Sequence, residues 1–164
     1  MRALTSDQDI KTALTEAKTI AIIGISKNET KASYFVGRYM QRRGYRIIPI
    51  NPVYAGDTIL GETVLADLAD VPQDVAVDIV DIFRRSEFVP EIVDQAIACL
   101  TPPPKTIWMQ FGIEHAQAAE KARAHGIQTI EDRCPKIEYQ RLFGELRRAG
   151  INTGIVTSKL PHRG

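Results

Sequence analysis

Five short segments of this chain combine glycine, arginine or amide side chains, and each directly follows a run of apolar residues. Arginine side chains bind anions, and glycine lets a ligand approach the backbone closely. The segments lack what covalent chemistry needs: we find no Ser-His-Asp order, no cluster of metal ligands and no paired carboxylates placed for a reaction. The pattern therefore indicates ligand binding. The segments are residues 24–26, 51–52, 83–85, 110–112 and 132–134.

The first segment follows the sequence TIAII at residues 19–23, whose β-branched side chains are typical of a buried strand. Gly24 ends this run, a polar loop follows at residues 27–31, and Ser33 begins a helical pattern. A strand, a glycine turn and a helix form the first unit of a nucleotide-binding α/β domain. The phosphates of such a ligand bind at the helix N-terminus, where free N–H groups and the helix dipole favour negative charge.

The other segments follow the ends of further predicted strands. Apolar runs alternate with helical patterns, which predicts an α/β, Rossmann-like fold: a single parallel sheet of about five strands with helices on both faces. Because ligands of such sheets bind beyond the carboxyl ends of the strands, the five segments should line one crevice. Strands are expected at residues 19–23, 45–50, 75–83, 106–109 and 129–130, and helices at 6–17, 33–43, 89–100, 114–125 and 137–149.

Length and composition are those of one domain. The chain has 164 residues, of which 44% are hydrophobic and 25% are charged. We therefore expect a single domain over residues 1–164, with its core at about 19–141 and a frayed tail at about 159–164. The net charge is +1, so no global field points to nucleic acid or an anionic membrane as a partner.

The sequence also predicts a cytoplasmic protein. Its apolar runs are far shorter than the roughly 20 residues that a bilayer span needs. Residues 1–7 contain no apolar core of a signal peptide. Cys99 and Cys134 stand apart from each other and from other metal-ligating residues, which argues against a disulfide framework or a zinc site. This cysteine usage fits a reducing compartment.

The glycine loop does not match the dinucleotide fingerprint G-x-G-x-x-G, because Ser26 and Glu29 occupy the second and third glycine positions. NAD sites also place an acid at the end of the second strand, where this chain has Asn51 and Pro52. An asparagine leaves room for a ribose phosphate, which a carboxylate would repel. The P-loop pattern G-x-x-x-x-G-K-[ST] is absent too. The sequence therefore weighs against NAD and against hydrolysis of ATP or GTP.

The same segments form five motifs in order: IIGIS at residues 22–26, IPINP at 48–52, DIFRR at 81–85, WMQFG at 108–112 and DRCPKIEY at 132–139. Together they resemble, over about residues 19–141, the small stand-alone bacterial CoA-binding proteins. Those proteins are similar to the CoA-binding domain of the succinyl-CoA synthetase alpha subunit and of ADP-forming acyl-CoA synthetases. The resemblance implies a Rossmann-type sheet that binds coenzyme A, or an acyl-CoA, across its carboxyl edge.

The resemblance also implies which side chains contact the ligand. The first loop would face the ligand, the second segment would flank its adenosine portion, the third its phosphates and pantetheine arm, and the fourth its far end. The synthetases also need a phosphohistidine loop and an ATP-grasp partner, which this sequence lacks, so we expect a binding module more than an enzyme. The residues implied are Gly24, Ser26, Lys27 and Ser33, then Asn51 and Pro52, then Phe83, Arg84 and Arg85, then Gln110 and Gly112.

Cys134 is a further candidate because it follows the fifth predicted strand, between Arg133 and Pro135, at the approach to a helix. A nearby arginine and a helix N-terminus both lower the pKa of a thiol. We therefore expect Cys134 near the ligand and able to form a mixed disulfide with coenzyme A; a small buried filler is the equal alternative. Cys99 lies beside the apolar stripe of its helix, where burial should keep it inert.

Two other functions remain open. The first is an NAD(P)-binding oxidoreductase or redox-sensing module, against which the missing fingerprint and acid argue. The second is an interaction subunit whose site completes a partner enzyme, and a homo-oligomer is open as well. Asp78 and Asp81 stand among the apolar residues of the third predicted strand. We expect them to be capped or at an edge rather than catalytic.

Overall fold

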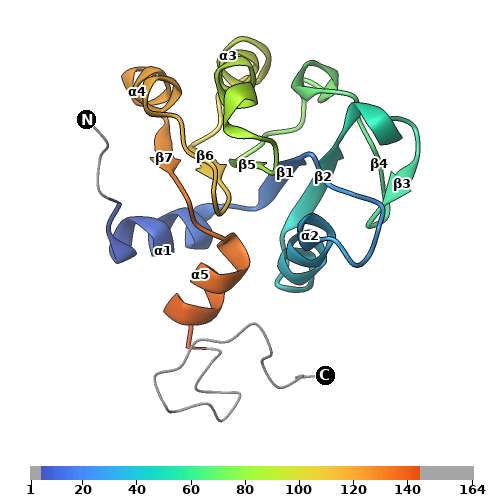
Figure 1. The fold of residues 1–164 in the computed structure, drawn as a ribbon, viewed down its shortest axis with the longest axis horizontal. Helices are drawn as coiled ribbons and strands as arrows, with labels where there is room; N and C mark the ends of the chain where they lie inside the picture. The colour runs from blue at the N-terminus through green and yellow to red at the C-terminus, as the bar shows by residue number, and fades with distance from the viewer. Residues whose placement is uncertain (1–4, 145–164) are drawn as a thin grey trace.

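The computed structural model describes residues 5–144, and at its centre lies a sheet of five parallel strands in the order β2-β1-β5-β6-β7 (Figure 1). This confirms the predicted parallel sheet. Its strands are short, and their residues are almost all buried, as in a sheet covered on both faces. The bounds are β1 Thr19–Ile23, β2 Arg46–Ile50, β5 Ile79–Ile82, β6 Thr106–Met109 and β7 Gln128–Ile130.

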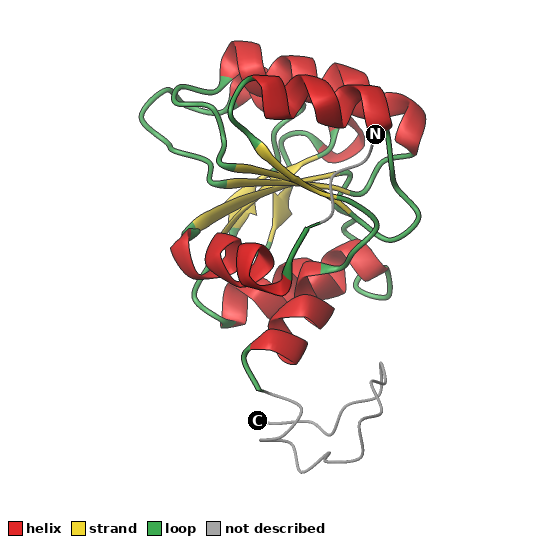
Figure 2. Ribbon diagram, turned by 90° about the vertical axis from the view of Figure 1, so that its left-hand side faces the viewer, coloured by secondary structure: helices red, strands yellow, loops and turns green. Residues whose placement is uncertain are grey.

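Helices cover both faces of the sheet, as predicted (Figure 2). One face carries α3 (Val89–Cys99) and α4 (Ala116–Ala124), and the other carries α1 (Asp7–Glu16), α2 (Ala32–Arg42) and α5 (Pro135–Leu142). Alternate strand residues therefore enter two separate cores. In β1, for example, Ala21 and Ile23 pack with the α3 side, whereas Ile20 and Ile22 pack with the α2 side.

The strand order places a topological switch point between β1 and β5. The chain leaves β1 through α2 toward β2 in one direction, and leaves β5 through α3 toward β6 and β7 in the other. Ile22 of β1 pairs in register with Asp81 of β5, and Ile23 pairs with Ile82. In open α/β sheets the connections diverge at such a point and leave a crevice at the carboxyl ends of the two strands.

The connection from β2 to β5 is the least regular part of the described chain. It contains a hairpin of two short strands, β3 (Thr58–Ile59) and β4 (Glu62–Thr63), between the 3-10 helices η1 (Pro52–Tyr54) and η2 (Leu68–Asp70). Both turn residues of the hairpin have positive φ, 52° at Leu60 and 82° at Gly61. Arg46 of β2 donates two hydrogen bonds to Glu62, at 2.7 and 2.9 Å, and so holds the hairpin against the sheet edge.

Several predicted boundaries are wrong. The strand expected at residues 75–83 runs only from Ile79 to Ile82. Asp78 directly precedes it, and its carboxylate accepts hydrogen bonds from the backbone of Lys18 and Thr19. The helix expected from residue 114 begins at Ala116, because Nδ1 of His115 caps it by accepting from the N–H of Ala118, at 3.2 Å.

The last helix, α5, begins at Pro135 rather than at residue 137, since proline is well suited to the first helical position. Within the described residues α5 ends at Leu142. The rest of the helix predicted to residue 149, and the frayed tail predicted at 159–164, lie outside the described residues.

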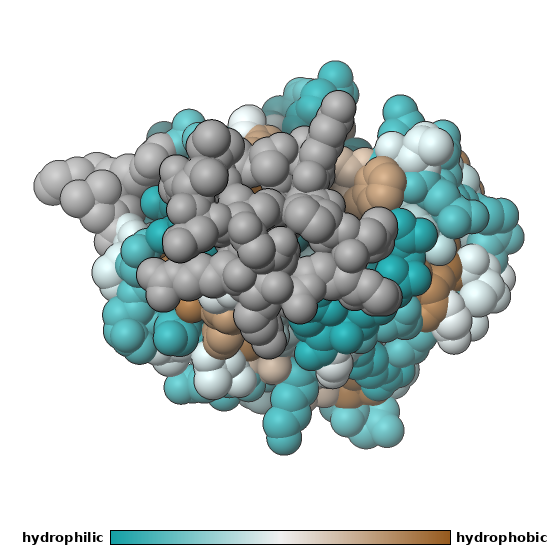
Figure 3. Space-filling model, turned by 90° about the horizontal axis from the view of Figure 1, so that it is seen from below, coloured by the Kyte–Doolittle hydropathy of each residue, from teal (hydrophilic) through white to brown (hydrophobic). Residues whose placement is uncertain are grey.

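The described surface is mostly polar. In Figure 3, which looks at the molecule from below, hydrophilic residues dominate where side chains are described, and hydrophobic areas are small. Among residues 5–144, no helix combines the length and apolar character needed to cross a membrane. Three large apolar side chains are exposed: Phe35 on α2, and Val53 and Phe111 in the loops after β2 and β6. Two of the three thus lie at the carboxyl edge of the sheet.

Candidate functional site

Gly24 lies at the switch point, and the structure leaves no room for a side chain there. Its φ is +90°, in the region that favours glycine. A Cβ atom at this position would lie 2.8 Å from the carbonyl oxygen of Phe83 and 3.1 Å from Cδ of Arg84. The N–H of Gly24 also donates to the carbonyl of Ile50, at 2.8 Å. The ends of β1, β2 and β5 therefore converge at this residue.

Ser33 and Asn51 hold the loop that follows Gly24. The buried hydroxyl of Ser33 accepts a hydrogen bond from the N–H of Ser26, at 3.0 Å. The side-chain amide of Asn51 donates to the carbonyl of Ile25, at 3.0 Å, and its oxygen accepts from the N–H of Val53. The structure thus brings these predicted ligand residues together and gives Ser33 and Asn51 a positioning role. Pro52 is the exposed first residue of η1.

The N-terminus of α2 opens beside this loop. Its N-cap residue, Lys31, makes no side-chain cap hydrogen bond, and the first turn contains no acidic residue. Free N–H groups and the helix dipole therefore favour an anion at this end. Lys27 lies in the same loop, where its ammonium group forms an ion pair with Asp57 at 3.2 Å; both side chains are about half exposed.

Arg84 and Arg85 differ in their surroundings. The guanidinium of Arg84 lies 4.2 Å from the ring centroid of Phe88, and its Cδ faces Gly24. Arg85 precedes the 3-10 helix η3 (Ser86–Phe88) and forms an ion pair with Glu87 at 3.2 Å, with 79% of its side chain exposed. The structure therefore places Arg84 at the switch point, whereas Arg85 reaches into solvent.

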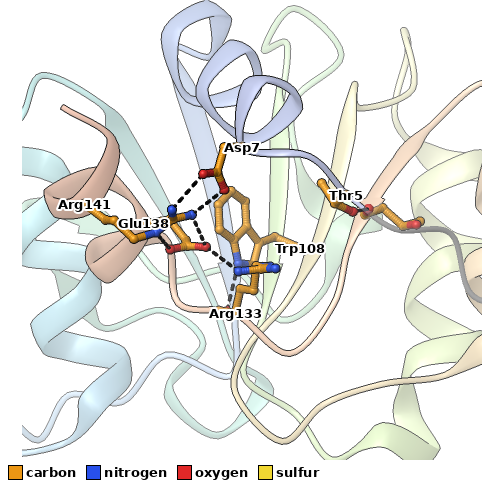
Figure 4. Close-up of polar contacts among 7 residues, drawn as sticks. Thr5, Asp7, Trp108, Arg133, Glu138 and Arg141 are labelled. Carbon is orange, nitrogen blue, oxygen red and sulfur yellow. Dashed lines mark hydrogen bonds and ion pairs between the residues drawn. The ribbon is translucent and has the colours of Figure 1, made fainter. Parts of the chain in front are cut away.

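The loops after β6 and β7 are joined to each other. The N–H of Gly112 donates to the carboxylate of Asp132, at 2.6 Å, and both residues have positive φ, +79° and +57°. The indole N–H of Trp108 donates to the carbonyl of Arg133, at 2.9 Å (Figure 4). Gln110 is buried between these loops. The predicted residues Gln110 and Gly112 thus lie at the carboxyl edge, next to the start of α5.

A network of charged side chains fixes α5 below this edge (Figure 4). The carboxylate of Glu138 is buried and accepts hydrogen bonds from Arg133, at 2.8 Å, and from Arg141, at 3.0 Å. Arg141 also donates two hydrogen bonds to Asp7 of α1, and these bonds are the main reason why the pKa of Asp7 is lowered. The network joins α1, α5 and the loop after β7.

The expectation that Cys134 has a lowered pKa is wrong. Cys134 is buried, and burial raises the pKa of its thiol above the ordinary value. The N–H of Ile137, at the start of α5, and the side chain of Gln110 offset part of this effect. Cys99 was expected to be the buried thiol, but it is only half-buried. Whether Cys134 forms a mixed disulfide with coenzyme A stays a prediction.

Asp81 is a residue whose importance the sequence did not reveal. Its side chain is completely buried, and neither of its carboxyl oxygens has a hydrogen-bond partner. Burial raises its pKa well above the ordinary value, which favours the protonated, neutral form of the group. The available signal was an acid inside the apolar run IVDIF, and the expectation that Asp81 is capped or at an edge is wrong. Asp78, by contrast, is capped as expected.

Fold and site together define a class: a Rossmann-like α/β domain whose candidate ligand edge lies at the β1/β5 switch point. Comparison with known proteins gives the family. The sequence profile described as "CoA binding domain" matches residues 18–140, and the chain belongs to this family.

The similar proteins match most of this chain, and the solved ones share its fold. The uncharacterized protein YneT of Bacillus subtilis (strain 168) is 33% identical over 134 residues, which cover 82% of this chain and 94% of the relative. A solved structure from Thermus thermophilus is 34% identical, with a TM-score of 0.78, and the match covers 85% of this chain and all of that one. A hypothetical protein from Pyrococcus horikoshii OT3 is 30% identical, with a TM-score of 0.77, over 88% of this chain and all of that one.

Proposed function

We propose that this protein binds coenzyme A, or an acyl-CoA, across the carboxyl edge of its sheet at the β1/β5 switch point. The observation that carries the proposal is the N-terminus of α2, which opens without a side-chain cap beside the loop after Gly24, in a chain of the CoA binding domain family. A helix N-terminus that favours anions, at the switch point of the sheet, is what a diphosphate needs.

The residues at this edge fit the chemistry of coenzyme A. The start of α2, with Lys27 nearby, and Arg84 offer positive charge to phosphates. Exposed Val53 and Phe111 offer apolar surface to the adenine ring and the pantetheine arm. β2 ends at Ile50 and is followed by Asn51, so no carboxylate there repels the 3′-phosphate that distinguishes coenzyme A from NAD.

The contribution of the protein in this proposal is binding and orientation. Asn51 and Ser33 hold the first loop in place, so the loop is ordered before the ligand arrives. A preorganised loop loses less conformational entropy on binding. We propose no reaction for the site, because its described side chains supply recognition without a nucleophile and base in hydrogen-bond contact.

Calorimetric titration of the purified protein tests the proposal. We expect coenzyme A to bind more tightly than dephospho-CoA, because the latter lacks the 3′-phosphate, and more tightly than NAD or NADP. Dephospho-CoA is the matched control, since it differs from coenzyme A by that phosphate alone. Equal or tighter binding of NAD would overturn the proposal in favour of the NAD(P)-linked alternative.

A further inference from the structure

Three side chains from different elements meet beneath the carboxyl edge: Asp81 of β5, Gln110 at the end of β6 and Cys134 at the start of α5. We call them the acid–thiol cluster. The exposed fractions of their side chains are 0%, 6% and 6%. Both carboxyl oxygens of Asp81 and the amide oxygen of Gln110 are buried without a hydrogen-bond partner. Buried polar atoms are paired in the great majority of cases, so three unpaired ones in one cluster need an explanation.

The unpaired acid is unfavourable for folding. A buried polar group without a hydrogen bond destabilises the folded state. Its replacement by an apolar residue of similar shape often leaves the stability unchanged or raises it. Residues that lower stability in this way are typical of binding and catalytic sites. A role for the acid–thiol cluster in ligand binding accounts for its presence.

The position of the cluster supports that role. Asp81 lies on β5, the strand that pairs with β1 just before Gly24. It pairs in register with Ile22 of β1, so it lies at the switch point. Phe83 follows two residues later on the same face of the chain, nearer the crevice, and is half-buried. Gln110 directly follows β6, the strand on the other side. The cluster is therefore the layer immediately below the proposed ligand edge.

The cluster contains no cation, and burial favours the neutral forms of Asp81 and Cys134, which restricts what it can bind. A protonated carboxyl has one O–H donor, and an amide oxygen is an acceptor. An amide group of a ligand presents the complementary pair, a carbonyl acceptor and an N–H donor. The pantetheine arm of coenzyme A contains two such amides, whereas a phosphate would find no cation here.

We propose that Asp81 and Gln110 bind an amide of the pantetheine arm, with the O–H of Asp81 donating to its carbonyl and the oxygen of Gln110 accepting from its N–H. Because Asp81 is completely buried, this contact requires the side chains above it to move when the arm binds. This inference rests on the proposed function and specifies how the uncharged portion of coenzyme A is recognised. Gln110, whose side chain also faces the sulfur of Cys134, links the amide to the start of α5.

The proposal predicts that binding weakens at high pH, when Asp81 loses its proton. Of the other titratable groups, Cys134 at the start of α5 interacts with Asp81. Glu138 on the same helix is paired with two arginines. α1 and α2 contribute apolar residues to this core, and Trp108 is the neighbour on β6. Arg84, in the loop after β5, stacks on Phe88.

The experiment compares two ligands on three proteins. Wild type, Asp81→Asn and Asp81→Leu are titrated with coenzyme A and with adenosine 3′,5′-bisphosphate, which lacks the pantetheine arm. Asp81→Leu should lose about tenfold in affinity for coenzyme A, the effect of one buried hydrogen bond, and bind the bisphosphate as wild type does. Asp81→Asn keeps a donor and should retain coenzyme A binding within about threefold, without the decline at high pH. Thermal unfolding of each variant verifies that it is folded.

Two outcomes contradict the inference alone: Asp81→Leu binds coenzyme A as tightly as wild type, or it loses affinity for both ligands by the same factor. The first shows that Asp81 does not contact the arm, and the second shows a general structural effect. If Asp81→Leu does not fold, the pH dependence of wild type and Asp81→Asn decides, since equal profiles contradict the inference. A wild-type protein that binds neither ligand contradicts the proposed function itself and this inference with it.

Discussion

One aspartate directly precedes β5 and another lies near its carboxyl end, and the two differ in their hydrogen bonds. At the amino end, the carboxylate of Asp78 accepts hydrogen bonds from two backbone N–H groups, at 2.8 and 3.0 Å. At the carboxyl end, Asp81 is completely buried and has no hydrogen-bond partner. The first aspartate joins the start of β5 to the start of β1, whereas burial of the second without a partner is unfavourable for folding.

A second comparison points the same way. Glu138 on α5 is almost as well buried as Asp81, but it forms ion pairs with two arginines, which join three elements of the fold (Figure 4). Paired polar groups therefore hold the helices and strands together, whereas the unpaired ones lie at the proposed ligand edge. Four predictions test this division.

The largest effect should come from the titration of Asp81. Its pKa in the folded protein is well above the ordinary value of 3.8, so the folded state holds the proton more tightly than the unfolded chain. The stability linked to this proton is fully present below about pH 3.8 and is lost as pH rises through the folded-state pKa. Between these pH values the loss is up to about 1.4 kcal/mol per pH unit.

Urea unfolding of wild type and Asp81→Asn over a series of pH values measures this effect. The Asn variant cannot titrate at this position, so the difference between the two proteins should grow with pH over that window. Asp78→Asn is the matched control at the other end of the strand. Parallel pH profiles for wild type and Asp81→Asn would show that Asp81 is not held neutral.

Breaking the paired network should reduce stability by a somewhat smaller amount. Glu138→Ala removes a buried carboxylate and leaves Arg133 and Arg141 without it, which we expect to lower the free energy of unfolding by about 2 kcal/mol. The matched control is Glu87→Ala, which breaks the exposed pair with Arg85 and should change stability by less than about 0.5 kcal/mol. Thermal unfolding compares them, and similar melting temperatures for both variants would contradict the structural role of the network.

The two neighbouring arginines should differ in ligand binding. Arg84→Ala removes the cation at the switch point and should weaken coenzyme A binding by about tenfold or more, the effect of one charge-assisted hydrogen bond. Arg85→Ala should weaken it by less than about threefold, because this side chain is mostly in solvent. Titration calorimetry measures both, and wild-type affinity should also fall as salt rises. No loss in an Arg84→Ala, Arg85→Ala double variant would remove Arg84 from the site, and equal losses in the two single variants would contradict the expected difference between them.

The smallest effect concerns the two thiols. Cys134 is buried with a raised pKa, and Cys99 is half-buried, so a small alkylating reagent should modify Cys99 first in the native protein. Intact-protein mass spectrometry follows the reaction, with Cys99→Ser and Cys134→Ser variants to assign each adduct. Faster modification of Cys134 would show that its thiol is open to the crevice and would favour the predicted mixed disulfide.

The sequence predicted the sheet because its signals are local and repeated. Buried positions recur in the sequence with the period of the strand or helix that contains them. The apolar run at residues 19–23 and the helical spacing after Val89 are such patterns, and both can be recognised locally. The hairpin between β2 and β5 escaped prediction because its strands have two residues each. The start of β5 was misplaced because the apolar run continues before the strand, at Val75 and Val77. The carboxylate of Asp78 bonds to the distant backbone of Lys18 and Thr19, a contact that no local pattern encodes.

The candidate site was only partly predictable, for a similar reason. Gly24 and Arg84 follow strands, so their place at the carboxyl edge follows from the topology. The pKa of Cys134 was misjudged because neighbouring charges are visible in sequence, whereas burial beneath Gln110 and α5 is not. Asp81 was overlooked because an acid in a strand is usually paired or at an edge, and only the structure shows that it has no partner.

The central claim is that coenzyme A binds at the carboxyl edge between β1 and β5, and a crystal structure of the complex tests it most directly. The account predicts phosphate density beside Gly24 and the first turn of α2, with the pantetheine arm running toward Gln110. The opposite edge of the sheet has a small cavity of about 60 Å³, lined in part by Thr12, Asp78 and Gln128. Coenzyme A bound there, or anywhere away from Gly24, would contradict the account.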